Sequence, residues 1–243
     1  MPPRLHVDQG LVAPGSLTLP ASAARHAQVL RLQPGQALTL FDGQGGEWSA
    51  EIATMERRSV QVQVLAHNPR ECESPVAVTL ALAMPANDRM DALVEKATEL
   101  GAVAVQPLVT DRSVLRLAGE RGQRRQAHWQ AIAIAACEQC GRNRVPTVQP
   151  VQAYAAWLAT LPTAGGRDSR LLLGWRDAAP WVQASVATGN ALTLLSGPEG
   201  GFTEAEEALA RGHGFTSVSL GPRVLRADTA PLAALAALVL RAT

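Results

Sequence analysis

The segment Leu194-Leu-Ser-Gly-Pro-Glu-Gly-Gly-Phe202 decides the fold class, because it joins an apolar strand pattern to a predicted helix. The strand is predicted over 191–196. The helix is predicted over 204–212, with Thr203 as its N-cap and Glu206 three residues further on, which is the pattern of a capping box. Apolar runs and helical patterns continue to alternate on both sides of this segment. Strands that alternate with helices indicate βαβ units and a parallel sheet.

The α/β pattern extends from residue 74 to the end of the chain. Its predicted strands are 76–83, 102–109, 171–174, 191–196 and 216–220. Its predicted helices are 88–100, 123–140, 151–161, 204–212 and 229–241. The last helix is apolar around its whole circumference. This predicts that it is buried on all sides, either inside the domain or partly against a partner subunit.

The first 70 residues follow a different pattern. Apolar and polar residues alternate over 37–41, 47–52 and 59–65, which is typical of half-buried strands, and one short helix is expected over 21–30. Short strands joined by tight turns indicate a small barrel or sandwich. A polar segment with two prolines, 67–75, is the predicted linker. We therefore predict an α/β protein with a β domain over 1–70 and an α/β domain over 74–243.

Charge and composition exclude several classes of function. The net charge is +1, so no global basic field indicates nucleic acid. Lys96 is the only lysine among 22 basic residues and lies in a helical pattern, which excludes a P-loop, since that loop needs a lysine after its glycines. Residues 111–146 hold seven arginines against three acidic residues. This local excess indicates either phosphate contacts or a solvated helix face.

Cysteine usage and hydropathy indicate a cytoplasmic protein without metal. Three cysteines do not form a disulfide framework in a chain of this length. Cys137 and Cys140 form a C-x-x-C at the predicted C-terminal end of a helix, where the helix dipole disfavours thiolate, and no second ligand pair is present for zinc. The longest apolar stretch, 230–240, is too short to span a membrane, and no signal peptide is visible.

Two glycine-containing loops, together with several shorter motifs, resemble a known family. Gly197-Pro-Glu-Gly-Gly-Phe202 and Leu220-Gly-Pro-Arg-Val-Leu-Arg226 resemble the SPOUT methyltransferases, and specifically the bacterial small-subunit ribosomal RNA (uracil-N3)-methyltransferases, the methyltransferase E family. The shorter motifs occur in the family's order: His26-Ala-Gln-Val-Leu-Arg31, Phe41-Asp-Gly43, Lys96-Ala-Thr-Glu-Leu-Gly101, Arg112-Ser113 and Glu138-Gln-Cys-Gly-Arg142. Together they cover nearly the whole chain.

The resemblance implies a fold, a cofactor and partners. It implies an N-terminal PUA-like RNA-binding β-barrel and a C-terminal α/β domain with a deep trefoil knot, although knots are generally rare. It also implies a homodimer that binds S-adenosylmethionine and acts on small-subunit ribosomal RNA, with no membrane or metal partner. Carried over by position, the cofactor residues are Leu173, Gly174, Leu195, Gly197, Pro198, Glu199, Gly200, Gly201, Leu220, Gly221, Arg223, Leu225 and Arg226.

Catalytic and RNA-binding residues follow from the same resemblance. Arg226 is expected to stabilise the anion that develops on the uracil, and Glu199 is a candidate general base by its location only. The expected RNA contacts are Arg4, His26, Arg31, Arg112 and Arg142. The chain departs from the family at Cys140, where serine is usual, and at residues 227–229, where Ala-Asp-Thr replaces Thr-Glu-Thr. A non-catalytic RNA-binding protein and a ribose 2′-O-methyltransferase are the alternative readings.

Overall fold

The structure is a computed structural model that describes residues 2–85, 89–162, 168–174, 178–181 and 191–242. The chain forms two compact units. The first comprises Met1–Glu73 and Ile134–Val145, and the second comprises Ser74–Ala133 and Pro146–Thr243. Residues 134–145 lie inside the range expected for the α/β domain, but their contacts place them in the first unit.

The first unit is built on a five-stranded sheet with the order β1-β3-β4-β5-β2. Its elements are β1 (Arg4–His6), β2 (Gly15–Thr18), α1 (Ala21–Val29), β3 (Ala37–Phe41), β4 (Glu47–Met55) and β5 (Val60–Asn68). Only the β1–β3 pair is parallel, and the other pairs are antiparallel. The expected helix and three strands are confirmed, whereas the short strands β1 and β2 were not predicted.

Alternating side chains form the core of the first unit. Leu38 and Leu40 of β3, and Val60, Val62 and Val64 of β5, are buried. They belong to one cluster that also includes three buried alanines of α1, Ala23, Ala24 and Ala27. Alternate residues of a strand face the same side, so the period of two seen in the sequence is the period of this buried face.

The second unit is an eight-stranded sheet in which every pairing between the described strands is parallel. Its strands are β6 (Ala77–Ala83), β7 (Ala104–Val109), β8 (Thr147–Val148), β9 (Gln152–Ala153), β10 (Ser169–Leu173), β11 (Ala179–Pro180), β12 (Ala191–Ser196) and β13 (Thr216–Ser219). The order is β11-β13-β10-β12-β6-β7-β8, and β9 pairs with β7. The predicted parallel sheet is confirmed, and the three two-residue strands were not predicted.

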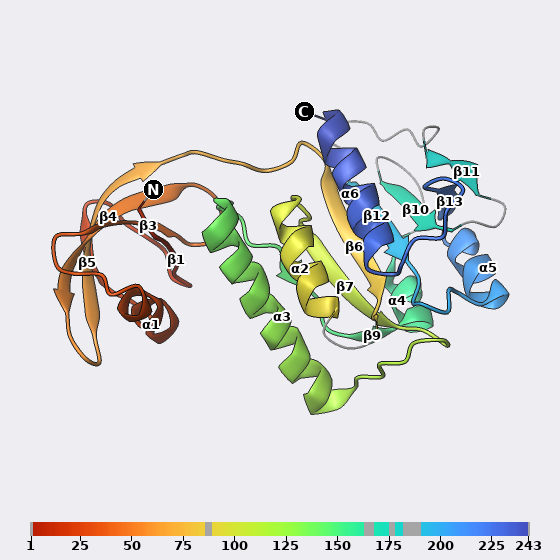
Figure 1. The fold of residues 1–243 in the computed structure, drawn as a ribbon, viewed down its shortest axis with the longest axis horizontal. Helices are drawn as coiled ribbons and strands as arrows, with labels where there is room; N and C mark the ends of the chain where they lie inside the picture. Colours follow the sequence, from red (N-terminus) through yellow and green to blue (C-terminus); the bar gives the residue numbers. More distant parts are fainter. Residues whose placement is uncertain (1, 86–88, 163–167, 175–177, 182–190, 243) are drawn as a thin grey trace. The chain divides into compact units, whose positions relative to one another are not determined.

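Helices cover both faces of this sheet (Figure 1). The helices are α2 (Arg89–Glu99), α3 (Gly119–Cys140), α4 (Tyr154–Thr160), α5 (Glu204–Gly212) and α6 (Thr229–Ala242). Residues of α4 and α5 share a buried cluster with Ala81, Leu172 and Leu195 of three strands. On the other face, α6 contacts both α2 and β12. The helix predicted over 151–161 divides into β9 and the shorter α4.

Within one chain the last helix is buried on one face only, so complete burial inside the domain is wrong, and packing of its other face against a partner subunit stays a prediction. Leu235 is fully buried within the unit, whereas Leu240 is 76% exposed. The largely apolar helix α6 therefore places one face against α2 and β12 and leaves another at the surface of the chain. Among the described residues, no helix is both long and apolar enough to cross a membrane.

Candidate active site at three strand ends

The carboxyl ends of three adjacent strands bring the predicted cofactor residues together. β10 lies between β13 and β12, with Leu172 beside both Ser217 and Leu195. Leu173 ends β10 and Gly174 follows it, residues 195–201 cover the end of β12 and the loop after it, and residues 220–226 follow β13. Because the strands are parallel, these segments meet at one edge of the sheet. Ligands of open α/β sheets bind at this edge.

The loop after β12 turns tightly into α5. Leu195 is buried, and the amide of Gly201 donates a 2.8 Å hydrogen bond to the carbonyl of Pro198. Gly201 has a φ of +66°, a conformation that favours glycine. The capping box predicted at Thr203 and Glu206 is present, so the start of α5 is fixed directly after the loop.

The loop after β7 braces this glycine-rich loop. Arg112 Nη1 donates hydrogen bonds of 2.8 Å to the carbonyl of Gly200 and 3.4 Å to that of Phe202. A Cβ at Gly200 would lie 3.3 Å from the Cβ of Arg112, so glycine permits this close approach. Beside it, the amide of Asp111 donates to the buried Glu206 carboxylate at 2.9 Å. Arg112, expected from the sequence to contact RNA, thus contacts the glycine-rich loop.

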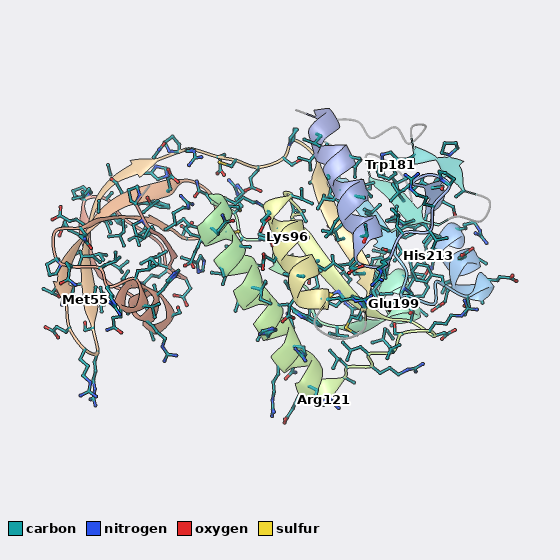
Figure 2. The ribbon with its side chains drawn as sticks, viewed as in Figure 1. Met55, Lys96, Arg121, Trp181, Glu199 and His213 are labelled. Atoms are coloured by element: carbon teal, nitrogen blue, oxygen red, sulfur yellow. The ribbon has the colours of Figure 1, made fainter. Side chains whose placement is uncertain are left out.

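Glu199 points from the glycine-rich loop toward α2. Its carboxylate lies 3.5 Å from Nη1 of Arg89, the first residue of α2, and about a third of its side chain is exposed. Figure 2 shows Glu199 in the loop between β12 and α5, and Lys96 on α2. The expected role of Glu199 as a base stays a prediction, with its carboxylate facing a guanidinium.

The loop after β13 leads into α6 without a side-chain cap. Arg223 and Arg226 are exposed, and the carbonyl of Arg226 accepts from the amides of Thr229 and Ala230 at 3.0 Å each. The Oδ1 atom of Asp228, just before α6, is buried and finds no hydrogen-bond partner among the described residues. A cavity of about 380 Å³ lies along this loop and β11, lined in part by Gly221 and Arg223.

A groove of about 490 Å³ lies between α2 and the start of α6. Its polar lining comes from Arg89, Lys96, Asp228 and Thr229, and its apolar lining comes from Ala92, Leu93, Leu232 and Ala233. Hydrogen bonds from Lys96 to Glu95 and Glu99, of 2.7 and 2.8 Å, raise the pKa of its ammonium group. Reasoning from the sequence did not anticipate this groove, because it needs two helices that lie far apart in the chain.

Two of the five predicted RNA contacts lie in the interior of the first unit, which is a correction. Arg142 is 3% exposed, and its guanidinium pairs with the carboxylate of Glu73, with Nε at 3.1 Å. The side chain of Arg4 is 10% exposed and donates to Glu47 and Asn143. Arginine is common both at RNA surfaces and in buried ion pairs, so the residue type alone did not distinguish them.

The other predicted RNA contacts lie at the surface. His26 is partly exposed and lies 3.1 Å from Glu138, and Arg31 is exposed with a φ of +55°, directly after the end of α1. Gln28 of α1 donates to the carbonyls of Glu56 and Arg57, which joins α1 to the turn between β4 and β5. Arg25, Arg31, Arg57 and Arg58 are exposed on these two elements. None of the four forms an ion pair among the described residues.

The cysteines occupy different environments. Cys137 is fully buried, and burial raises the pKa of its thiol to about 12, which makes it inert as a nucleophile. Cys72 is exposed, Cys140 is half-buried, and all three are free thiols. Within the described part of the chain, no group of three histidine, cysteine or acidic residues is arranged to hold a metal.

Comparison with known proteins assigns the family. An RNA methyltransferase domain model matches residues 72–239, and an RNA methyltransferase PUA domain model matches residues 19–65. The chain belongs to the ribosomal RNA small subunit methyltransferase E family. It is 35% identical to the Synechocystis member over 96% of this chain and 76% of the relative, and 33% identical to the Bacillus subtilis member over 86% and 84%.

Solved structures of similar proteins agree with the methyltransferase E family. The enzyme from Neisseria gonorrhoeae, bound to S-adenosyl methionine, is 38% identical, with a TM-score of 0.91 over 98% of this chain and 97% of that one. A methyltransferase from Legionella pneumophila with bound SAM is 32% identical, with a TM-score of 0.93 over 99% and 98%. The fold of this chain is therefore that of known cofactor-binding members.

Proposed function

We propose that this protein transfers the methyl group of S-adenosylmethionine to N3 of a uridine in small-subunit (16S) ribosomal RNA. The observation that carries the proposal is the convergence of three loops, 173–174, 195–201 and 220–226, at one edge of a parallel sheet. The family member from Neisseria gonorrhoeae and a similar methyltransferase from Legionella pneumophila have been solved with this cofactor bound.

The residues at the three strand ends fit S-adenosylmethionine. The cofactor site consists of Leu173, Gly174, Leu195, Gly197, Pro198, Glu199, Gly200, Gly201, Leu220, Gly221, Arg223, Leu225 and Arg226. Glycines leave backbone N–H and C=O groups open to a ligand, and the acidic Glu199 suits a cationic one. We further propose that these loops form the trefoil knot of the SPOUT methyltransferases.

The proposed chemistry needs positioning and charge stabilisation. The bound cofactor supplies a methyl group on a sulfonium. N3 of uracil loses its proton as it accepts the methyl group, and the ring carries negative charge while it does so. Arg226 is exposed in the loop after β13, where its guanidinium stabilises that charge. N3 lies on the Watson–Crick edge, so the target base must be unpaired or flipped.

The first unit is proposed to be a PUA-like RNA-binding barrel. Phosphate contacts fit the exposed arginines of α1 and of the β4–β5 turn, together with His26. Arg31 adopts a left-handed conformation that costs about 1–2 kcal/mol for a residue with a Cβ. This conformation ends α1, with the amide of Leu32 donating to the carbonyl of Ala27 at 3.1 Å, and it presents Arg31 at the surface. Arg112 in the second unit remains exposed enough to touch RNA as well.

We also propose a cytoplasmic homodimer that uses the outer face of α6. Leu240 is exposed, and the neighbouring Ala236, Ala237 and Val239 are half-buried within the chain. An apolar face of this kind at the C-terminal half of a helix is suited to packing against a second copy. The target, ribosomal RNA, is itself cytoplasmic.

The experiment that tests this function is methyl transfer from radiolabelled S-adenosylmethionine to small ribosomal subunits that lack the modification. The RNA is then digested to nucleosides. Label in 3-methyluridine is expected. Label in a ribose 2′-O-methyl nucleoside would instead support the other reaction class. No transfer, together with no heat on titration with the cofactor, would support an RNA-binding protein without catalysis.

A further inference from the structure

The local excess of arginine over residues 111–146 divides into two groups in the structure. Arg142 is buried beside Glu73, and Arg144 lies 3.2 Å from the carboxylate of Glu71. The other five are exposed, in the loop after β7 and at the start of α3: Arg112, Arg116, Arg121, Arg124 and Arg125. We call these five residues the arginine surface.

Few carboxylates offset the charge of the arginine surface. Residues 111–125 contain five arginines and two acidic residues, a net charge of +3 in a chain whose total is +1. One of the two acidic residues, Glu120, pairs with Arg124 at 3.0 Å. Neither Arg121 nor Arg125 forms an ion pair among the described residues. The surface is therefore a local concentration of uncompensated positive charge.

The packing of α3 fixes the direction of these side chains. The side chain of Gln126 donates to the carbonyl of Val148 in β8 at 2.9 Å, and Trp129 is buried. This face of α3 is thus held against the second unit. With 3.6 residues per turn, Arg121 and Arg124 lie on the opposite side of the helix, in solvent. Figure 2 shows Arg121 at the N-terminal end of α3.

The spacing of the arginines on α3 carries an electrostatic cost. Arg121 and Arg125 are four residues apart, so their like charges lie one helical turn from each other. Such a pair lowers helix stability by about 0.2–0.5 kcal/mol. A solvated helix face usually places opposite charges at this spacing. An anion between the two guanidinium groups removes the repulsion, so the surface fits an anionic partner better than water alone.

The arginine surface begins beside the loops proposed to hold the cofactor. β7 pairs with β6, β6 pairs with β12, and all three strands are parallel. The loop after β7 therefore leaves the same edge of the sheet as the glycine-rich loop. Arg112 connects the two loops through its hydrogen bond to the carbonyl of Gly200. An anionic chain bound along the surface thus adjoins the proposed cofactor loops.

The surface offers charge without aromatic rings. Residues 111–128 contain no phenylalanine, tyrosine or tryptophan, and the next residue, Trp129, is buried. Proteins that hold unpaired bases usually stack them on exposed aromatic side chains. Guanidinium groups match the oxygens of a phosphate in geometry and charge. The chemistry of the surface therefore favours phosphates over bases.

We propose that the arginine surface binds the phosphate backbone of the ribosomal RNA outside the target nucleotide. The inference rests on the proposed function. It gives the second unit RNA contacts of its own, in addition to those proposed for α1 and the β4–β5 turn of the first unit. These contacts are independent of base sequence. Each releases about one counterion from the RNA, so binding weakens as the salt concentration rises.

Two double variants of equal charge test the proposal. Arg121→Gln with Arg125→Gln removes two charges from the surface. Arg144→Gln with Arg211→Gln removes two charges that pair with Glu71 and Glu207, and is the control. Filter binding of two RNA hairpins of different sequence, without cofactor, measures the Kd. It should rise about tenfold for the first variant and less than about twofold for the control, and the salt slope of the first should fall by about 2.

Two further readouts separate a phosphate contact from a structural role. Arg121→Lys with Arg125→Lys keeps both charges and should retain the RNA affinity within about threefold, because lysine binds phosphate as a point charge. In methyl transfer to small subunits, the glutamine variant should raise KM, with kcat at saturating subunits and the cofactor Kd equal to those of wild type.

An RNA Kd of the glutamine variant within about twofold of the control would overturn the proposal and leave a solvated helix face. A loss confined to one of the two hairpins would also overturn it, because only base contacts distinguish sequences in this way. Formation of 3-methyluridine by wild type tests the proposed function separately. Binding of the hairpins requires no methyl transfer, so the two failures are distinguishable.

Discussion

Replacing Arg112 by alanine should weaken cofactor binding even when no RNA is present. The side chain joins the loop after β7 to the glycine-rich loop through the carbonyls of Gly200 and Phe202. Without this brace, the glycine-rich loop samples conformations that do not bind the cofactor. The apparent Kd for the cofactor then rises, because only the fraction of molecules whose loop has the binding conformation can bind.

The size of the effect follows from the geometry. The bond to Gly200 is 2.8 Å long and the bond to Phe202 is 3.4 Å, so only the first is near its optimal length. A hydrogen bond to a charged group contributes about 1.5–3 kcal/mol, and the exposure of Arg112 reduces this to about 1 kcal/mol. Since about 1.4 kcal/mol corresponds to a factor of ten, the Kd for S-adenosylmethionine should rise about fivefold.

Isothermal titration calorimetry on the isolated protein measures this Kd directly. Arg116→Ala is the control. This substitution removes the same charge from the same loop, and among the described residues Arg116 donates only to the carbonyl of Asp111, at 2.9 Å. Arg112→Lys should recover part of the affinity through a single bond to Gly200. A Kd for Arg112→Ala equal to that of Arg116→Ala would refute the brace and leave Arg112 as an RNA contact alone.

Four further outcomes are expected. Arg226→Ala should lower turnover by about 10²–10³-fold with little change in cofactor Kd, in single-turnover assays at saturating cofactor. Exchanging Arg57 and Arg58 for glutamine should weaken RNA binding and reduce the slope of log K against log salt by about 2, as measured by filter binding. Leu240→Glu should convert a dimer into monomers in sedimentation velocity, and a monomeric wild type would contradict that interface. At mildly alkaline pH, a thiol reagent should leave Cys137 unmodified in the native protein, because the pKa of that thiol is raised to about 12; mass spectrometry of the labelled peptides would reveal the opposite.

Local patterns in the sequence predicted much of the fold. The capping box at Thr203 and Glu206 fixed the start of α5, and the alternation over 37–41 matched β3. Strands as short as β8 and β9 carry too few residues for a period to be visible. Their pairing with β7 depends on the tertiary structure rather than on local preference.

The candidate site was predictable where it follows strand ends, and not where it depends on contacts between distant residues. The glycine-rich loop could be identified because glycines after a strand are visible in the sequence. The brace from Arg112 joins residues 88 apart, and the ion pair of Arg142 with Glu73 joins residues 69 apart. Neither pairing leaves a local signal. The buried Oδ1 of Asp228 likewise depends on how α6 packs against α2.

The nucleoside composition of small-subunit ribosomal RNA, with and without this gene, tests the central claim most directly. Mass spectrometry of digested RNA from the source organism should detect 3-methyluridine in the wild type and lose it on deletion of the gene. A plasmid copy should restore it. An unchanged amount of 3-methyluridine after deletion, or loss of a different modified nucleoside, would contradict the account.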